Sequence, residues 1–108
     1  MGKQTIKADT TADAYLTLLA DRGVDYLFGN AGTDFASVIE ALSKAQLGEA
    51  KSPTPVTVPH ENVAVAMAHG YYLATGRPQA VMLHVTVGTA NGVCGIMNAS
   101  CERIPMLF

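Results

Sequence analysis

The stretch from Ser52 to Cys101 contains only two formally charged side chains, Glu61 and Arg77. Charged residues make up 15% of the whole chain, which is below the roughly 25% typical of soluble domains. A stretch so poor in charge is expected to be covered on most sides. A domain of about 100 residues, however, buries only about 60–70% of its unfolded surface. The pattern therefore predicts that this stretch is the central layer of something larger, or that it faces a partner.

Apolar runs of two kinds alternate along the chain. Short β-branched or aromatic runs predict strands, and apolar residues at helical spacing predict helices. The expected strands are 26–28, 56–58, 80–85 and 106–108; the expected helices are 11–22, 34–46, 60–75 and a fourth that starts at 93; glycine turns are expected at 29–32 and 88–92. Continuous apolar strands that alternate with helices indicate a parallel sheet covered by helices on both faces, a three-layer, flavodoxin-like α/β fold. Because the chain stops within an apolar strand, we expect it to be truncated.

Composition argues against several classes of protein. A net charge of −2 offers no basic patch for nucleic acid, and no apolar run of about 18 residues predicts a helix that spans a membrane. Residues 1–9 lack the apolar core of a secretory signal. Two cysteines, Cys94 and Cys101, are too few for a disulfide scaffold, so we expect a cytoplasmic protein with both thiols buried. The histidines have no metal-ligand spacing, so no metal site is expected.

Three polar segments follow the predicted strands, at residues 29–34, 59–62 and 85–91. Ligands of open parallel sheets bind beyond the carboxyl ends of the strands, so we expect the three segments to meet at one edge. The glycine turn at 29–32 leads into a helix. Such a turn is typical of a phosphate site and equally typical of a plain strand-to-helix connection.

Glu61 is the only carboxylate between Glu49 and Glu102. It falls in the first turn of the apolar helix 60–75, where desolvation would raise its pKa and the helix macrodipole would lower it. A desolvated carboxyl group suits proton transfer, whereas the plainer interpretation is a residue that starts a helix. His84 is open to two interpretations as well, a residue of the sheet edge or a residue of the site.

The order of these motifs resembles the N-terminal pyrimidine-binding domain of thiamin-diphosphate-dependent enzymes of the acetolactate synthase, benzoylformate decarboxylase and pyruvate decarboxylase group. The resemblance covers residues 10–108 and is carried by 28–33, 60–72, 75–78, 88–91 and 98–105. It implies an enzyme that decarboxylates or ligates 2-oxo acids as a homodimer or homotetramer, with thiamin diphosphate as cofactor. It also implies that Mg²⁺ is bound by a region absent from residues 1–108, and that this incomplete domain is inactive by itself.

The resemblance further implies roles for individual residues. The glutamate that matches Glu61 hydrogen-bonds the cofactor's aminopyrimidine ring and promotes its imino tautomer. The imine then deprotonates the thiazolium to the ylid, which acts as an electron sink. The histidine that matches His84 in benzoylformate decarboxylase assists proton transfer, and a serine that contacts the substrate carboxylate corresponds to Thr33. The other implied cofactor contacts are Ala31, Gly32, Gly88 and Asn91.

Two functions from other classes remain open at this point. The chain could be a non-catalytic flavodoxin-like module that binds a small phosphorylated ligand. It could also serve only for dimer assembly, with helix 60–75 packed against a copy of itself. Glu61 discriminates among these functions, because only the enzyme requires its carboxylate for turnover.

Overall fold

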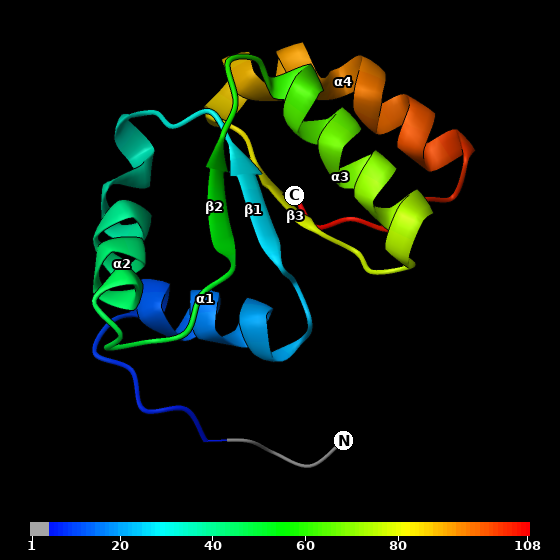
Figure 1. Ribbon diagram of the computed structural model, residues 1–108. Helices are drawn as coiled ribbons and strands as arrows, with labels where there is room; N and C mark the ends of the chain where they lie inside the picture. Colours follow the sequence, from blue (N-terminus) through cyan, green and yellow to red (C-terminus); the bar gives the residue numbers. More distant parts are fainter. Residues whose placement is uncertain (1–4) are drawn as a thin grey trace.

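A parallel sheet forms the middle layer of the computed structural model, which describes residues 5–108 (Figure 1). Its strands are β1 (Tyr26–Gly29), β2 (Thr54–Thr57) and β3 (Ala80–Met82), in the spatial order β2-β1-β3. The helices are α1 (Thr11–Asp21), α2 (Ala36–Gln46), α3 (Glu61–Thr75) and α4 (Val85–Cys101), with a short 3₁₀ turn η1 (Thr33–Phe35) before α2. The first four residues, part of the segment expected not to be a signal, lie outside the described residues.

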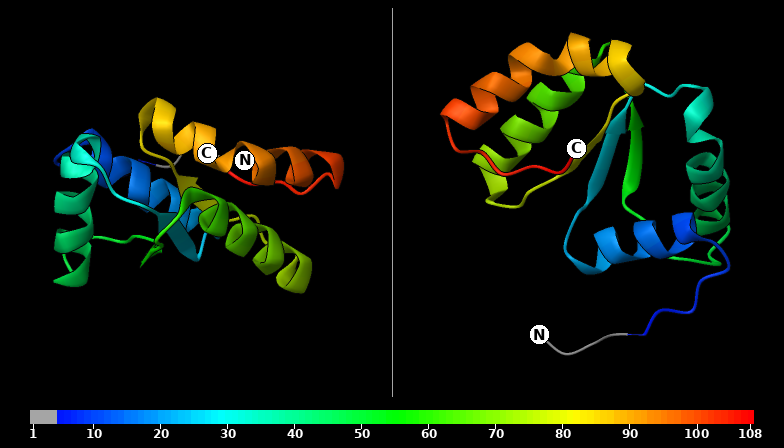
Figure 2. Two further views of the ribbon diagram at one scale, coloured as in Figure 1. Left: turned by 90° about the horizontal axis from the view of Figure 1, so that it is seen from above. Right: turned by 180° about the vertical axis from the view of Figure 1, so that it is seen from behind.

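Helices cover both faces of the sheet, which confirms the predicted three-layer α/β fold. Successive side chains of a strand point to opposite faces, and neighbouring residues of β1 separate in this way. Leu27 packs with the buried apolar residues of α1 and α2, including Leu16 and Leu42. Phe28 packs with Val58 and with the buried residues of α3. Figure 2 shows the two helix layers on either side of the strands.

Local signals set the ends of the helices where the sequence predicts them. Thr10 caps α1 through a capping box, in which its hydroxyl accepts from the Asp13 N–H and the Asp13 carboxylate accepts from the Thr10 N–H. Each such cap contributes about 1 kcal/mol. His60 caps α3 by accepting from the Asn62 N–H. Gly76 ends α3 at a φ of 70°, in the left-handed region that favours glycine.

The second predicted glycine turn, 88–92, is wrong, because these residues lie inside α4. The helix begins at Val85, eight positions before the predicted start at 93. The glycines face α3 at very close range. A Cβ on Gly95 would lie 2.6 Å from Asn62 Oδ1 and 2.9 Å from Val65 Cγ1, both in α3. A Cβ on Gly92 would lie 3.6 Å from Val65 Cγ2 and 3.2 Å from Leu83 Cδ1, which precedes α4. Glycine is required here by helix–helix packing, which overrides its low helix propensity.

The strands also differ from their predicted bounds. β2 begins two residues earlier, at Thr54, and ends at Thr57. β3 ends at Met82, so His84 lies beyond the strand. The predicted strand 106–108 is reduced to one parallel bridge between Leu107 and Ala80, in which the Val81 N–H donates to the Leu107 carbonyl at 2.8 Å. Leu107 thus lies beside the β3 edge without a full ladder.

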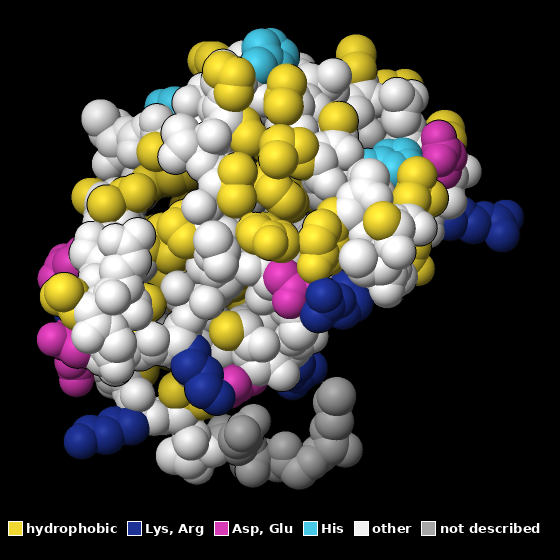
Figure 3. All heavy atoms as spheres, viewed as in Figure 1, with side chains coloured by type: hydrophobic (Ala, Val, Ile, Leu, Met, Phe, Trp, Pro, Cys, Tyr) yellow, Lys and Arg dark blue, Asp and Glu magenta, His cyan; other side chains and the backbone are white. Residues whose placement is uncertain are grey.

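Helices α3 and α4 correct two predictions: that the charge-poor stretch is covered on most sides, and that both cysteines are buried. Helix α3 is not enclosed in this chain: Ala64 and Val65 are fully buried against the sheet, whereas Val63 and Met67 are 43% and 41% exposed. Cys94 and Cys101 are exposed, not buried. Figure 3 shows apolar side chains gathered over this part of the molecule. Within residues 5–108, none of the helices has the length and apolar character needed to cross a membrane.

Candidate functional site

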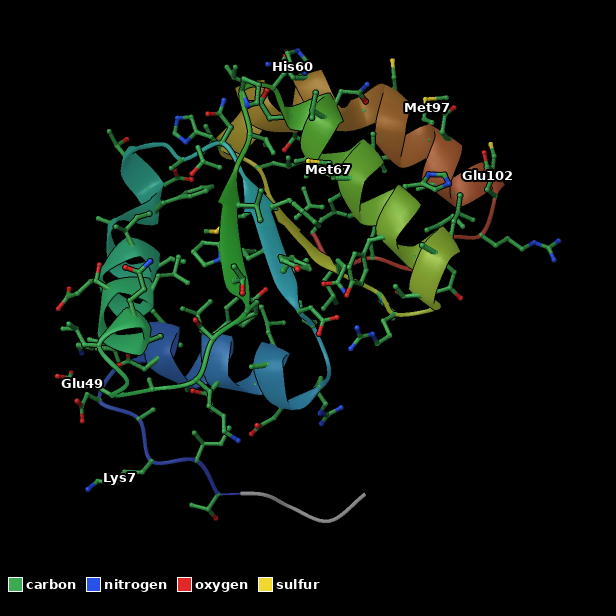
Figure 4. All side chains as sticks on the ribbon, viewed as in Figure 1. Lys7, Glu49, His60, Met67, Met97 and Glu102 are labelled. Carbon is green, nitrogen blue, oxygen red and sulfur yellow. The ribbon has the colours of Figure 1, made fainter. Side chains whose placement is uncertain are left out.

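Three chain segments meet at the carboxyl edge of the sheet, as the sequence predicts. Asn30 follows β1, Glu61 opens α3 after β2, and Asn91 lies in α4 after β3. The Asn91 amide donates to Glu61 Oε2 at 3.0 Å, and the Asn30 amide donates to Oε1 at 3.4 Å. Figure 4 marks this edge by His60, at the end of the molecule where α3 begins. One carboxylate therefore connects all three segments.

The sequence leaves open whether the pKa of Glu61 is raised by desolvation or lowered by its surroundings, and the structure shows the direction. Its side chain is buried, with 5% exposure, and it lies at the N-terminus of α3. The pKa of Glu61 is lowered by a hydrogen bond from its own backbone N–H and by the Asn91 amide, against the opposing effect of burial. Hydrogen bonds to the charged form thus prevail over desolvation. At neutral pH Glu61 is an anionic acceptor.

Gly88 closes the space beside this carboxylate. A Cβ on Gly88 would lie 3.4 Å from Glu61 Oε1 and 3.2 Å from the backbone carbonyl carbon of Leu83. The glycine is itself buried. α4 therefore passes against the Glu61 side chain with backbone alone, and Asn91, about one helical turn further on, reaches the other carboxylate oxygen.

A second group of residues surrounds His84, at the same edge of the sheet. His84 stands at the N-cap position of α4, and its Nδ1 lies 2.5 Å from Asp34 Oδ1. The imidazole covers Gly32 so closely that a Cβ there would lie 2.1 Å from Nδ1. The ring of Phe35 meets it edge-on, with centroids 6.5 Å apart. The first glycine turn and α4 are joined through this histidine.

The predicted site residues fall into three sets. Glu61, Gly88 and Asn91 lie together, and so do Gly32 and His84. Ala31 and Thr33 are also at this edge and are exposed. Among residues 5–108, neither the Ala31 backbone nor the Thr33 side chain hydrogen-bonds to either set.

Two residues of the site, Asn30 and Asp34, were missed by sequence reasoning. Both lie in the glycine turn, where Asn and Asp are ordinary turn and cap residues. An Asp that precedes a predicted helix favours a helix cap. In the structure Gly32 takes the cap position of η1 without a side-chain hydrogen bond. Their spacing in the sequence gives no signal for the partners Glu61 and His84, which lie 31 and 50 residues away.

The residues around Glu61 fit a nitrogen heteroaromatic ring. A buried carboxylate, anionic and already flanked by two amide donors, can accept from a ring N–H and orient it. Glycine at position 88 places no side chain of α4 against carboxylate oxygen Oε1, which accepts from the Asn30 amide. The described residues contain no group of three His, Cys, Asp or Glu side chains placed to hold a metal ion. The arrangement around Glu61 can therefore accept a hydrogen bond from a ring and orient it.

The chain is similar to known proteins over almost its whole length. Residues 9–108 match the family model described as thiamine pyrophosphate enzyme, N-terminal TPP binding domain. The chain is 32% identical over 97 residues to the acetolactate synthase large subunit of Haemophilus influenzae, covering 90% of this chain and 16% of that protein. It is 30% identical over 99 residues to the benzoylformate decarboxylase of Pseudomonas aeruginosa, covering 92% and 17% respectively.

A solved structure is similar in fold as well as in sequence. It is an X-ray structure of a Mycobacterium smegmatis protein assigned to the thiamin diphosphate-dependent enzymes. The TM-score is 0.73 at 30% sequence identity, and the match covers 91% of this chain and 18% of that one. The chain thus spans less than a fifth of the length of each of these relatives.

Proposed function

The chain belongs to the thiamine pyrophosphate enzymes, as their N-terminal TPP binding domain, and we propose that the complete protein decarboxylates or ligates 2-oxo acids. The observation that carries the proposal is the buried, anionic Glu61 held between Asn30 and Asn91. Two relatives support the substrate class, since benzoylformate is a 2-oxo acid and acetolactate synthases join such units. Residues 1–108 are then an incomplete pyrimidine-binding domain, inactive by itself.

Thiamin diphosphate, when bound, supplies an electron sink for the carbanion left after a 2-oxo acid loses carbon dioxide. Glu61 would hold the aminopyrimidine ring by accepting a hydrogen bond from the N–H that a ring nitrogen carries in the imino tautomer, and would so favour that tautomer. Asn30 and Asn91 keep the carboxylate in place and favour its charged form. Ala31, Gly32 and Gly88 would present backbone to the ring, because they add little or no side chain at this edge.

The second proposed catalytic residue is His84. Its Nδ1 is occupied by Asp34, so Nε2 is the atom that would give or accept a proton near the reacting carbonyl. Thr33 is exposed in η1, and its hydroxyl would contact the substrate carboxylate. Mg²⁺ and the diphosphate would be held outside residues 5–108, since no donor cluster for a metal lies within them.

The exposed apolar side of α3 and α4 supports the proposal that the enzyme is a homodimer or homotetramer. Val63, Met67 and Met97 are 43%, 41% and 61% exposed, and large exposed apolar patches mark interaction surfaces. We place the enzyme in the cytoplasm, because both cysteines are free and exposed, as a reducing compartment allows.

The test is Glu61→Gln in the full-length enzyme supplied with thiamin diphosphate and Mg²⁺. Glutamine keeps the shape and hydrogen-bonding reach of Glu61 but removes the anion. We expect turnover of 2-oxo acids to fall by about 10²–10⁴-fold, with an unchanged circular dichroism spectrum. The matched control is Glu40→Gln on the exposed side of α2, which removes the same charge. Near-normal thiamin-dependent turnover in Glu61→Gln would show that the proposed mechanism is wrong and would leave the binding or assembly functions.

A further inference from the structure

We propose that Asp34 is a positioning residue for His84: it binds Nδ1 and so leaves Nε2 as the atom available for proton exchange. This inference rests on the proposed function, in which His84 serves the reaction. The sequence assigned Asp34 no role in the site, and Asp34 lies 50 residues before His84 in the chain.

The contact itself is short and directional. Asp34 Oδ1 lies 2.5 Å from His84 Nδ1, and a carboxylate can only accept a hydrogen bond. Nδ1 must therefore carry the proton. The side chains of Asp34 and His84 are 38% and 35% exposed, so the pair lies at the surface of the carboxyl edge and not in the core. Within residues 5–108, His84 Nε2 has no hydrogen-bond partner.

The backbone on both sides of the imidazole is shaped around this arrangement. Beneath the ring, Gly32 has no Cβ, and a Cβ would overlap the imidazole with distances of 2.1–2.5 Å to three ring atoms. Next to it in sequence, Val85 has a φ of 37°. A β-branched residue at positive φ is a true outlier, and such strain is concentrated at functional sites.

An ordinary surface ion pair would not need these features. Exposed ion pairs contribute little to stability and tolerate loose geometry. Here the ring is fixed from below by Gly32, at its edge by Phe35 and at Nδ1 by Asp34. A carboxylate that fixes the tautomer and orientation of a histidine is a recurrent way to prepare the opposite ring nitrogen for acid–base work.

The first experiment measures the tautomer directly and needs no cofactor. In the ¹⁵N-labelled 108-residue chain, long-range ¹H–¹⁵N spectra at a pH where the imidazole is neutral should show His84 protonated at Nδ1. In Asp34→Ala, the Nδ1–H signature should be lost in favour of a mixture dominated by Nε2–H. The matched control, Asp9→Ala, removes an exposed carboxylate before α1 and should leave His84 unchanged. The backbone amide pattern of the same samples reports the fold.

The second experiment uses the full-length enzyme and the shape-conserving Asp34→Asn. We expect kcat to fall by about tenfold, a part of the roughly 10²–10⁴ that a placed acid–base group contributes. KM should stay within about twofold, since Asp34 orients His84 and does not bind substrate. Asp9→Asn should retain the parent kcat.

The outcomes separate this inference from the proposed function. A His84 tautomer that is the same in Asp34→Ala and in the parent chain overturns the inference, whatever the enzyme does. An unchanged kcat in Asp34→Asn overturns it as well. A tautomer that depends on Asp34, together with full turnover in Glu61→Gln, would support the positioning and refute the proposed role of Glu61.

Discussion

The two ends of the parallel sheet are built in opposite ways. At the amino end, polar groups are bonded to each other on almost every side. At the carboxyl end, among residues 5–108, the His84 ring has one hydrogen-bond partner and the Glu61 carboxylate has two from other residues, next to glycines and a strained residue. Both ends belong to the same three strands, so the difference comes from the residues placed there and not from the architecture.

Gln79 organises the amino end. Its side chain is fully buried, its Oε1 accepts from the N–H groups of Asp25 and Tyr26 at 2.9 and 2.7 Å, and its Nε2 donates to the Pro78 carbonyl at 2.9 Å. Asp25 in turn binds Arg77 at 3.0 Å and accepts from the Tyr71 hydroxyl at 2.9 Å, a bond that raises the pKa of Tyr71. This network stabilises the strand ends and leaves little to react.

At the carboxyl end, His84 and Glu61 can form further hydrogen bonds. His84 has a free Nε2 among the described residues, and the Glu61 carboxylate has only two amide donors from other residues. The Glu61 carboxylate is buried and can accept further hydrogen bonds from a ligand, whereas the His84 side chain is 35% exposed. We infer that the amino end serves stability and that the carboxyl end serves the proposed binding and chemistry, so we expect variants at the amino end to lower stability more than variants at the carboxyl end.

The largest expected effect on stability comes from Gln79→Ala. It leaves the part-buried N–H groups of Asp25 and Tyr26 without their acceptor, and an unsatisfied buried donor costs about 1–3 kcal/mol. We expect the free energy of unfolding of the 108-residue chain to fall by about 2–4 kcal/mol in urea titrations. Gln46→Ala, at the exposed end of α2, is the control and should stay within about 0.5 kcal/mol of the parent. Equal effects of the two substitutions would refute the importance of the amino-end network.

A smaller effect is expected from Gly32→Ala at the carboxyl end. The new methyl group would overlap the His84 ring at 2.1 Å, so the ring must move, at a cost of about 1–3 kcal/mol. The ring nitrogen shifts of His84 should change with it. Gly70→Ala in α3 is the matched control, because a Cβ there meets nothing within 4 Å and should stabilise the helix by up to about 1 kcal/mol. If both alanines stabilise the chain, the close packing of His84 on Gly32 is wrong.

The smallest effect is the acid dependence of stability. The pKa of Glu61 in the folded chain is below its ordinary value of 4.5, so its anion favours the folded state above that pH. This contribution is lost as the pH falls through the lowered pKa. Acid unfolding followed by circular dichroism should therefore be less steep below about pH 4.5 in Glu61→Gln than in the parent. Asp13, whose pKa is also lowered by Thr10, titrates in both chains, so the difference isolates Glu61. Parallel acid curves would contradict the lowered pKa.

The fold could be predicted from the sequence because its signals are local. Short apolar runs, the Thr10 cap and the glycine at position 76 each act within a few residues of themselves. Glu61 could also be predicted as a site residue, because it is the only carboxylate between Glu49 and Glu102. The direction of its pKa shift could not be predicted, because the pKa is lowered first by the Glu61 backbone N–H and then by the Asn91 amide, whose contact depends on how α4 packs.

The errors arose where tertiary packing overrides local preference. Gly88 and Gly92 suggest a turn by composition, but they serve a close crossing of α3 and α4. Asp34 suggests a helix cap, but it turns to a histidine on another segment. Residues 106–108 suggest a strand by composition, but only Leu107 forms a bridge. In each case the deciding partner is far away in the chain.

The close crossing of α3 and α4 connects the packing at Gly95 to the position of the other end of α4. Gly95 lies ten residues after Val85 in the same helix, about 15 Å along its axis. A side chain at Gly95 would push α4 away from Asn62 and Val65 of α3. We expect this displacement to shift Asn91, in α4, and His84, at the N-cap of α4. A residue with no atom near the reacting groups thus sets their alignment, and a mutational scan restricted to the neighbourhood of Glu61 would overlook it.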